Sequence, residues 1–228
     1  MTPYYQEKWV TIYNGDCREI LPQLDVKVDL VLTDPPYNIG ANYSGNSSDS
    51  KDDYWEWFKD IITLCRAKSE IVIFTHKVQA LRYIIDWDWV GIWNKPYSSG
   101  TRMGNSNIVP HYEPIFMYGI HKLGVHSKYT SDVFTQNPSG QGQVGGYHGR
   151  EVAKVAVEGH RFTKPNELIT TLIELYGNDL ILDPFLGSGT TCYCAKKLNR
   201  YSIGIEIVEK YCEIAAKRCS QEVMELGI

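Results

Sequence analysis

The chain of 228 residues predicts an α/β fold in which helices cover both faces of a mostly parallel sheet. Short apolar runs rich in β-branched residues alternate along the chain with longer segments of helical periodicity. Most of these runs end at Gly, Pro, Asn or Asp, which interrupt regular structure. The length suits one domain, residues 1–228, with room for a small insertion.

The first half of the chain begins with a strand, a turn at Asn14-Gly15-Asp16 and a short helix. A second strand ends at Asp34, because two prolines follow it. Asp53 is placed to cap the helix that comes after a polar loop. The strands expected in this half are 9–13, 26–33, 70–75, 89–93 and 114–118. The helices expected there are 17–24, a segment after Asp53, and 78–85.

Regular periodicity disappears between residues 119 and 159, where Gly, Ser, Gln and Asn are frequent. A segment of this length without a pattern is usually functional or disordered. Beyond it we expect helices at 166–176, 190–198 and 208–226, and strands at 180–183 and 201–206.

The composition is that of an ordinary soluble globular protein, with 43% hydrophobic residues and a net charge of −4. No apolar run is long enough to span a membrane, and the polar, aromatic start is unlike a signal peptide. The six cysteines lack C-x-x-C and zinc spacings, so we expect reduced thiols, a cytoplasmic protein and no metal centre. Residues 92–165 carry eight basic and four acidic side chains, which fits a locally basic face and an ordinary surface scatter equally well.

A glycine-rich turn, Asp183-Pro184-Phe185-Leu186-Gly187-Ser188-Gly189-Thr190-Thr191, joins an expected strand to an expected helix. Glycines there let backbone N–H groups approach a nucleoside-containing cofactor closely. Glu206 ends the next strand, 17 residues after Gly189, where a carboxylate can accept hydrogen bonds from ribose hydroxyls. No phosphate-loop Gly-Lys-Ser/Thr follows, and the third glycine of a dinucleotide site is absent. Taken alone, the pattern fits a tight strand–helix turn with a solvated glutamate better.

Asp34-Pro35-Pro36-Tyr37 lies where an apolar strand ends, at the expected mouth of a ligand crevice. An exocyclic amine on a nucleobase is a weak nucleophile, because its lone pair is delocalised into the ring. The Asp34 carboxylate and the Pro35 carbonyl can accept its two N–H groups and turn the lone pair toward an electrophile. Tyr37 offers a flat surface on which an extruded base can stack. A rigid strand exit with a capping aspartate explains a generic Asp-Pro-Pro equally well, so the tyrosine and the glycine-rich turn decide for catalysis.

Together these segments resemble the motifs of amino-group DNA methyltransferases. Residues 33–38, Thr-Asp-Pro-Pro-Tyr-Asn, resemble the catalytic motif, and residues 183–191 resemble the motif that binds S-adenosylmethionine (SAM). The catalytic motif comes first, as in the permuted β group to which many N6-adenine enzymes belong. The turn at Asp16 resembles the one whose acid meets the SAM adenine. His160-x-x-x-Lys164-Pro165-x-x-Leu168 resembles the segment beside the methionine part of SAM.

The resemblance implies a Rossmann-like SAM-dependent methyltransferase fold, with a mixed seven-stranded sheet that contains one antiparallel strand. It implies direct in-line transfer of a methyl group to N6 of adenine in DNA after base flipping, as in restriction–modification systems. The residues expected in catalysis are Asp34, Pro35, Pro36 and Tyr37. Those expected to contact SAM are Asp16, Asp34, Lys164, Asp183, Phe185, Gly187, Ser188, Gly189, Thr190, Thr191 and Glu206.

Residues 119–159 take the place of the family's target-recognition segment. The segment is short, so a homodimer or a very short target would compensate for it. Positive side chains within reach of phosphates are expected to contact DNA, although a solvated surface role is as consistent for each. With Tyr37, the candidates are Lys95, Arg102, Lys128, Arg150 and Lys154.

Three alternatives stay open from the sequence. N4 of cytosine poses the same chemical problem, although an aspartate at position 34 leans toward adenine in the family. A catalytically inactive DNA-binding module is disfavoured by the intact Asp34, Tyr37, Gly187 and Gly189. The cofactor half would also serve a methyltransferase that acts on RNA or a small molecule.

Overall fold

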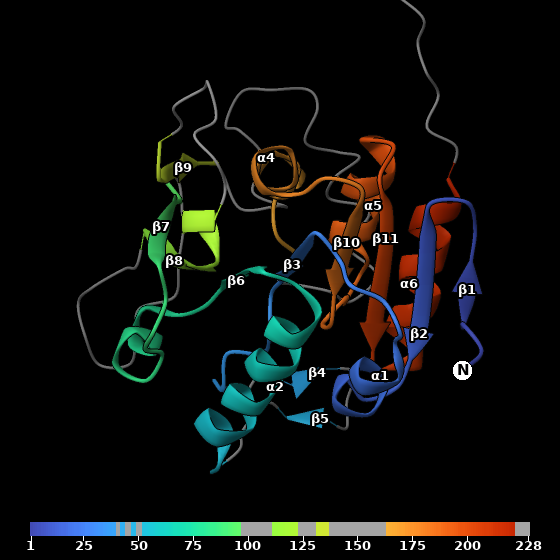
Figure 1. Cartoon of the computed structure of the whole chain (residues 1–228), viewed down its shortest axis with the longest axis horizontal. Coiled ribbons are helices and arrows are strands. Elements are labelled where there is room, and N and C mark those ends of the chain that lie inside the picture. Colours follow the sequence, from blue (N-terminus) through green and yellow to red (C-terminus); the bar gives the residue numbers. More distant parts are fainter. Residues whose placement is uncertain are drawn as a thin grey trace, which may run out of the picture.

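The computed structural model describes residues 1–39, 42–43, 47–48, 52–96, 111–122, 131–136 and 163–221. Their strands form one large sheet and a separate antiparallel pair, β4 (Asn42–Tyr43) with β5 (Ser47–Ser48) (Figure 1). In sheet order, the large sheet contains β1 (Tyr5–Gln6), β2 (Val10–Asn14), β11 (Tyr201–Glu206), β10 (Leu180–Asp183), β3 (Leu30–Thr33), β6 (Ile71–Thr75), β8 (Tyr112–Tyr118), β7 (Trp89–Asn94) and β9 (Val133–Thr135).

The strand directions confirm the predicted mixed sheet. From β2 to β6 each strand runs parallel to its neighbours, and β8 is antiparallel to both β6 and β7. These seven strands are the expected set, and the short strands β1 and β9 extend the sheet at its two edges. The sequence did not predict β9, because three residues are too few for a periodic pattern. Its pairing with β7, from Ile92 opposite Val133, defines it.

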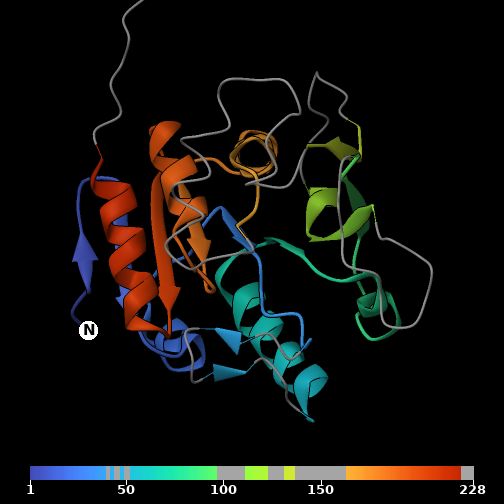
Figure 2. The same ribbon diagram turned by 180° about the vertical axis from the view of Figure 1, so that it is seen from behind.

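Helices cover both faces of the sheet, as the views from front and back show (Figures 1 and 2). On one face lie α1 (Cys17–Gln23) and α2 (Tyr54–Lys68), and on the other α4 (Asn166–Tyr176), α5 (Thr190–Lys197) and α6 (Glu209–Ser220). The alternation of side chains along β3 produces this layering. Val31 packs with α1 and α2, whereas Leu30 and Leu32 pack with α4.

Some predicted elements are shorter in the structure. Within the predicted strand 26–33, the backbone N–H of Val28 donates to Lys68 at the end of α2, so β3 begins only at Leu30. The predicted helix 78–85 is a short 3₁₀ turn, η1 (Val78–Arg82), and a second such turn, η2, spans Ile120–Lys122. Asp53 occupies the cap position of α2, but its side chain makes no capping hydrogen bond, which corrects the predicted cap. The sequence predicts a final helix over residues 208–226, but α6 ends at Ser220 and Gln221 is extended. Residues 222–228 lie outside the described part of the chain.

Candidate active site

The strand directions bring several chain segments together at the end of the sheet where the parallel strands have their carboxyl ends. The parallel strands β3 and β6 end there at Thr33 and Thr75. Because β8 runs the opposite way, its first residues, including Glu113, lie at this same end. β7 also ends here, and Lys95 follows it directly. Side chains from four separate strand ends can therefore meet beside the Asp34 corner.

The Asp34 carboxylate is held by three side chains. Its Oδ2 atom lies 2.9 Å from the ammonium group of Lys164. Its Oδ1 atom accepts hydrogen bonds from the hydroxyl of Tyr37 at 2.8 Å and from that of Thr75 at 2.5 Å. The orientation of this carboxylate is thus set by residues from β6, from the corner itself and from the segment before α4.

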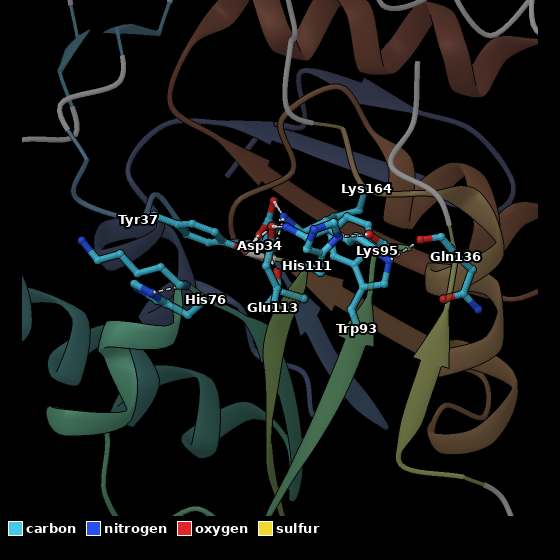
Figure 3. A network of polar contacts seen from close by, with 11 residues as sticks. Asp34, Tyr37, His76, Trp93, Lys95, His111, Glu113, Gln136 and Lys164 are labelled. Carbon is cyan, nitrogen blue, oxygen red and sulfur yellow. Dashed lines mark hydrogen bonds and ion pairs between the residues drawn. The ribbon is translucent and has the colours of Figure 1, made fainter. Parts of the chain in front are cut away.

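Glu113 forms a second centre of the same network, as Figure 3 shows. Its Oε1 atom lies 2.7 Å from Lys95, and its Oε2 atom lies 3.3 Å from Lys164 and 3.0 Å from the Tyr37 hydroxyl. That hydroxyl has one proton, which it can donate to Asp34 or to Glu113. Burial alone would raise the pKa of this carboxyl, but Lys164 and Lys95 lower it to about 2. The pKa of Lys164 is raised, since Asp34 and Glu113 outweigh the opposing effect of its burial. Glu113 and Lys164 are therefore both charged at neutral pH.

Lys95 follows β7 and points into the site. Only 11% of its side chain is exposed. Its ammonium group forms an ion pair with Glu113 and lies 5.2 Å from the centre of the Trp93 ring. Lys164 faces the same ring at 5.4 Å, so one buried indole adjoins both cations. This burial and the ion pair favour a role of Lys95 inside the site, and its predicted contact with DNA phosphates stays a prediction.

A buried histidine supports the Asp-Pro-Pro-Tyr corner from below. The ring of His76 stacks on that of Tyr37, with centroids 4.8 Å apart and planes inclined by 16°. Its Nδ1 atom accepts from the backbone N–H of Lys77, so the proton resides on Nε2, which lies 2.7 Å from the Tyr54 hydroxyl. That hydroxyl donates in turn to the carbonyl of Pro36. Burial lowers the pKa of His76 to about 3, so the ring stays neutral.

The glycine-rich turn forms a backbone cradle beside this corner. Gly187 and Gly189 adopt φ values of +54° and +84°, and a Cβ on Gly189 would lie 2.8 Å from that of Ala215. The Glu206 carboxylate accepts from the backbone N–H groups of Gly187 at 2.9 Å and Val208 at 2.8 Å. Glycines at positive φ and an acid at the next strand end fit a nucleoside-containing cofactor.

Asp16 lies in the turn after β2 and Asp183 is the last residue of β10, so the two acids lie on either side of β11. Gly15 donates its backbone N–H to the carbonyl of Glu206, which places the turn after β2 against the end of β11. The Asp16 carboxylate caps α1 and pairs with Arg18 at 2.6 Å. Burial raises the pKa of Asp183 to about 6, and its Oδ1 atom accepts from the Thr33 hydroxyl at 2.6 Å. The residue before Asp34 is thereby bound to the first residue of the glycine-rich turn.

The structure brings together most of the predicted site residues, and it adds partners that the sequence did not single out. The additions are Thr75, His76, Tyr54 and Glu113. Each is a polar residue close to one end of an apolar strand or at the start of a helix. Such positions are common in a sequence, and they indicate a shared site only once the pairing of the strands is known. The predicted DNA contacts Arg102, Lys128, Arg150 and Lys154, together with His160, lie outside the described residues.

Among the residues that the structure describes, no helix is long and apolar enough to cross a bilayer. Nor do they contain a group of three or more His, Cys, Asp or Glu side chains placed to hold a metal ion. All six cysteines are buried and unpaired.

Comparison with known proteins agrees with this geometry. A family model described as a DNA methylase of the N6/N4 class matches residues 28–217. The type II methyltransferase M.ScaI of Streptomyces caespitosus is 29% identical over 266 residues, covering 98% of this chain and 86% of that protein. The DNA adenine methyltransferase YhdJ of Escherichia coli is 27% identical over 248 residues, covering 91% and 82%.

Among solved structures, the M1.HpyAVI–SAM complex superposes with a TM-score of 0.62 at 25% identity, covering 93% of this chain and 100% of that one. The fold is thus shared with a methyltransferase that was solved with SAM. The chain belongs to the N6/N4 family of DNA methylases, enzymes that methylate N6 of adenine or N4 of cytosine in DNA, and SAM is its methyl donor.

Proposed function

We propose that this methyltransferase modifies N6 of adenine at a specific DNA sequence, after the target base has been turned out of the duplex. The observation that carries the proposal is the placement of the Asp34 carboxylate beside Tyr37, one residue from the Thr33–Asp183 link to the cradle. The aspartate at position 34 and the similarity to a DNA adenine methyltransferase favour adenine over cytosine.

In this proposal the corner binds the base amine through two acceptors. The Asp34 carboxylate accepts one N–H, and the Pro35 carbonyl accepts the other. The neighbouring Pro36 carbonyl is already engaged by the Tyr54 hydroxyl, so it is not the acceptor. Tyr37, supported by His76 on one face of its ring, is the surface against which the base stacks. These contacts orient the amine lone pair without a covalent enzyme intermediate.

The cofactor is held by the residues around the cradle. Backbone groups of residues 185–191 and the carboxylates of Asp16, Asp183 and Glu206 line it, and Lys164 and Asp34 border it on the corner side. Bound SAM supplies a methyl group on a positively charged sulfur, which makes that carbon an electrophile. The chain's own contribution is to orient the amine and to exclude water from the buried network around Asp34.

We further propose that residues 119–159 recognise the target within a single domain, and that Arg102, Lys128, Arg150 and Lys154 contact phosphates. A homodimer would compensate for the short recognition segment. The burial of six unpaired cysteines favours a cytoplasmic protein.

The test incubates the protein with labelled SAM and mixed-sequence DNA, followed by digestion to nucleosides. We expect labelled N6-methyladenine from the wild type and none from Asp34→Ala, whereas Asp25→Ala, which removes an exposed carboxylate elsewhere, keeps full activity. Labelled N4-methylcytosine without N6-methyladenine would reject the adenine assignment. Unchanged methylation by Asp34→Ala would reject the site.

A further inference from the structure

Lys164 and Tyr37 each contact two carboxylates. The Lys164 ammonium lies 2.9 Å from Asp34 and 3.3 Å from Glu113. The Tyr37 hydroxyl lies 2.8 Å from Asp34 and 3.0 Å from Glu113. Glu113 is therefore a second acceptor for two of the three side chains that hold Asp34.

This sharing bears on how Asp34 can accept a substrate. A carboxylate offers about four acceptor sites, and Oδ1 of Asp34 already takes hydroxyl groups from Tyr37 and Thr75. The other oxygen faces the Lys164 ammonium. As the methyl group reaches the amine, positive charge develops on the amine nitrogen. A cation on the same carboxylate opposes that charge.

Lys164 cannot simply be withdrawn from Asp34. Its side chain is 9% exposed, and a buried ammonium group that loses its carboxylate is strongly destabilising. Glu113 removes this difficulty, because it already lies within ion-pair distance of the same ammonium group. A small movement of Lys164 then exchanges one carboxylate for the other.

We propose that Glu113 is a positioning residue that receives Lys164 and the Tyr37 hydroxyl when the base amine engages Asp34. This inference rests on the proposed function and deepens it. Glu113 acts through Asp34 and does not itself touch the reacting atoms.

The surroundings of Glu113 suit this role. Its backbone lies in β8, where it is paired with Trp93 of β7, so the carboxylate is carried by the sheet and not by a loop. Lys95 keeps a separate ion pair with Oε1, which leaves Oε2 for the two shared partners. Its low pKa keeps the carboxylate charged throughout the neutral range.

A kinetic experiment tests the role with Glu113→Gln, which keeps the shape of the side chain and removes its charge. Lys164 then pairs with Asp34 alone. We expect kcat to fall about tenfold or more, with KM for SAM and DNA changed by less than about threefold. Glu113→Asp, which keeps the charge, should recover part of kcat. The control Glu7→Gln, which breaks the Lys196 pair near the opposite edge of the sheet, should leave kcat unchanged.

A stability experiment tests the sharing without any methylation assay. Melting temperatures are measured for Asp34→Asn, Glu113→Gln and the double variant, all without SAM or DNA. Glu113→Gln also removes the partner of Lys95, but that loss recurs in the double variant and cancels in the comparison. Each single variant still leaves Lys164 one carboxylate. The double variant leaves it none, so its fall in Tm should clearly exceed the sum of the two single falls.

The outcomes separate this inference from the proposed function. Additive changes in Tm, or a Glu113→Gln variant with wild-type kcat, would overturn the role of Glu113 while DNA methylation by the wild type still supports the function. A wild type that methylates no DNA would overturn the proposed function, and with it the exchange of Lys164 between the two carboxylates during catalysis. Non-additive Tm values would still show that Lys164 is shared by Asp34 and Glu113.

Discussion

The hydroxyl of Thr33 donates a hydrogen bond to Oδ1 of Asp183 at 2.6 Å, between residues 150 positions apart in the chain. Thr33 is the last residue of β3 and precedes Asp34, and Asp183 is the last residue of β10 and opens the cofactor turn. The two strands are parallel neighbours, so this bond joins the two sides of the site directly.

Removing that bond should loosen both sides of the site. In Thr33→Val the shape is kept, but the buried Asp183 carboxyl loses a donor, so we expect a loss of about 1–3 kcal/mol in unfolding free energy. KM for SAM should rise as well. Urea denaturation and steady-state kinetics measure the two effects. Thr171→Val, which loses an exposed hydroxyl bond within α4, is the matched control, and equal effects of both variants would contradict the link.

The Tyr54 hydroxyl should matter for rate more than for stability. Tyr54→Phe keeps the packed ring but cuts the connection from His76 to the Pro36 carbonyl, so the corner loses an orienting contact. We expect kcat to fall about tenfold, since small misplacements of reacting groups are costly. Tyr118→Phe, which loses a hydroxyl bond to the Ile85 carbonyl on the other side of η1, should retain full kcat. Wild-type kcat in both variants would remove Tyr54 from the site.

Asp183 makes stability depend on pH. Burial raises its pKa from 3.8 to about 6 in the folded state, so its favourable contribution is complete below about pH 3.8 and is lost as the pH rises through about 6. Asp183→Asn cannot ionise, and its amide oxygen can still accept from Thr33. Relative to the wild type, the variant should gain at most about 3 kcal/mol between pH 4 and pH 7. Denaturant unfolding across this range measures it, and a constant difference would contradict the raised pKa.

Lys95 should not contribute to the salt dependence of DNA binding. Each side chain that contacts a phosphate steepens the fall of the logarithm of the DNA-binding constant with the logarithm of the salt concentration by about 0.9. Lys95 forms an ion pair with Glu113 instead. Lys95→Met should therefore keep the wild-type slope, measured by fluorescence anisotropy at several salt concentrations. Arg150→Met, a proposed phosphate contact, is the comparison and should reduce the slope. A lower slope for Lys95→Met would show that DNA binding releases this lysine from Glu113.

Much of the fold could be predicted because its signals are local. The strand 180–183, the helix 166–176 and the strand 201–206 appear in the structure with the predicted bounds, since apolar periodicity and flanking breakers specify them. β9 could not be predicted, because pairing with β7 and not its own sequence makes it a strand. The late start of β3 depends in the same way on a contact with another element, since Val28 donates to the carbonyl of Lys68 in α2.

The sequence by itself determined the two motifs and their order, and hence the chemistry of the Asp34 corner and the glycine-rich turn. Both are contiguous segments whose residue types restrict the backbone, so they can be recognised without a structure. The tertiary structure alone decided the partners of Asp34. Glu113 enters the site because β8 runs antiparallel to β6, and His76 enters it because it follows β6, which is parallel to β3. Lys95 is drawn into the site by its ion pair with Glu113. Such contacts depend on strand direction and register, which no short stretch of sequence encodes.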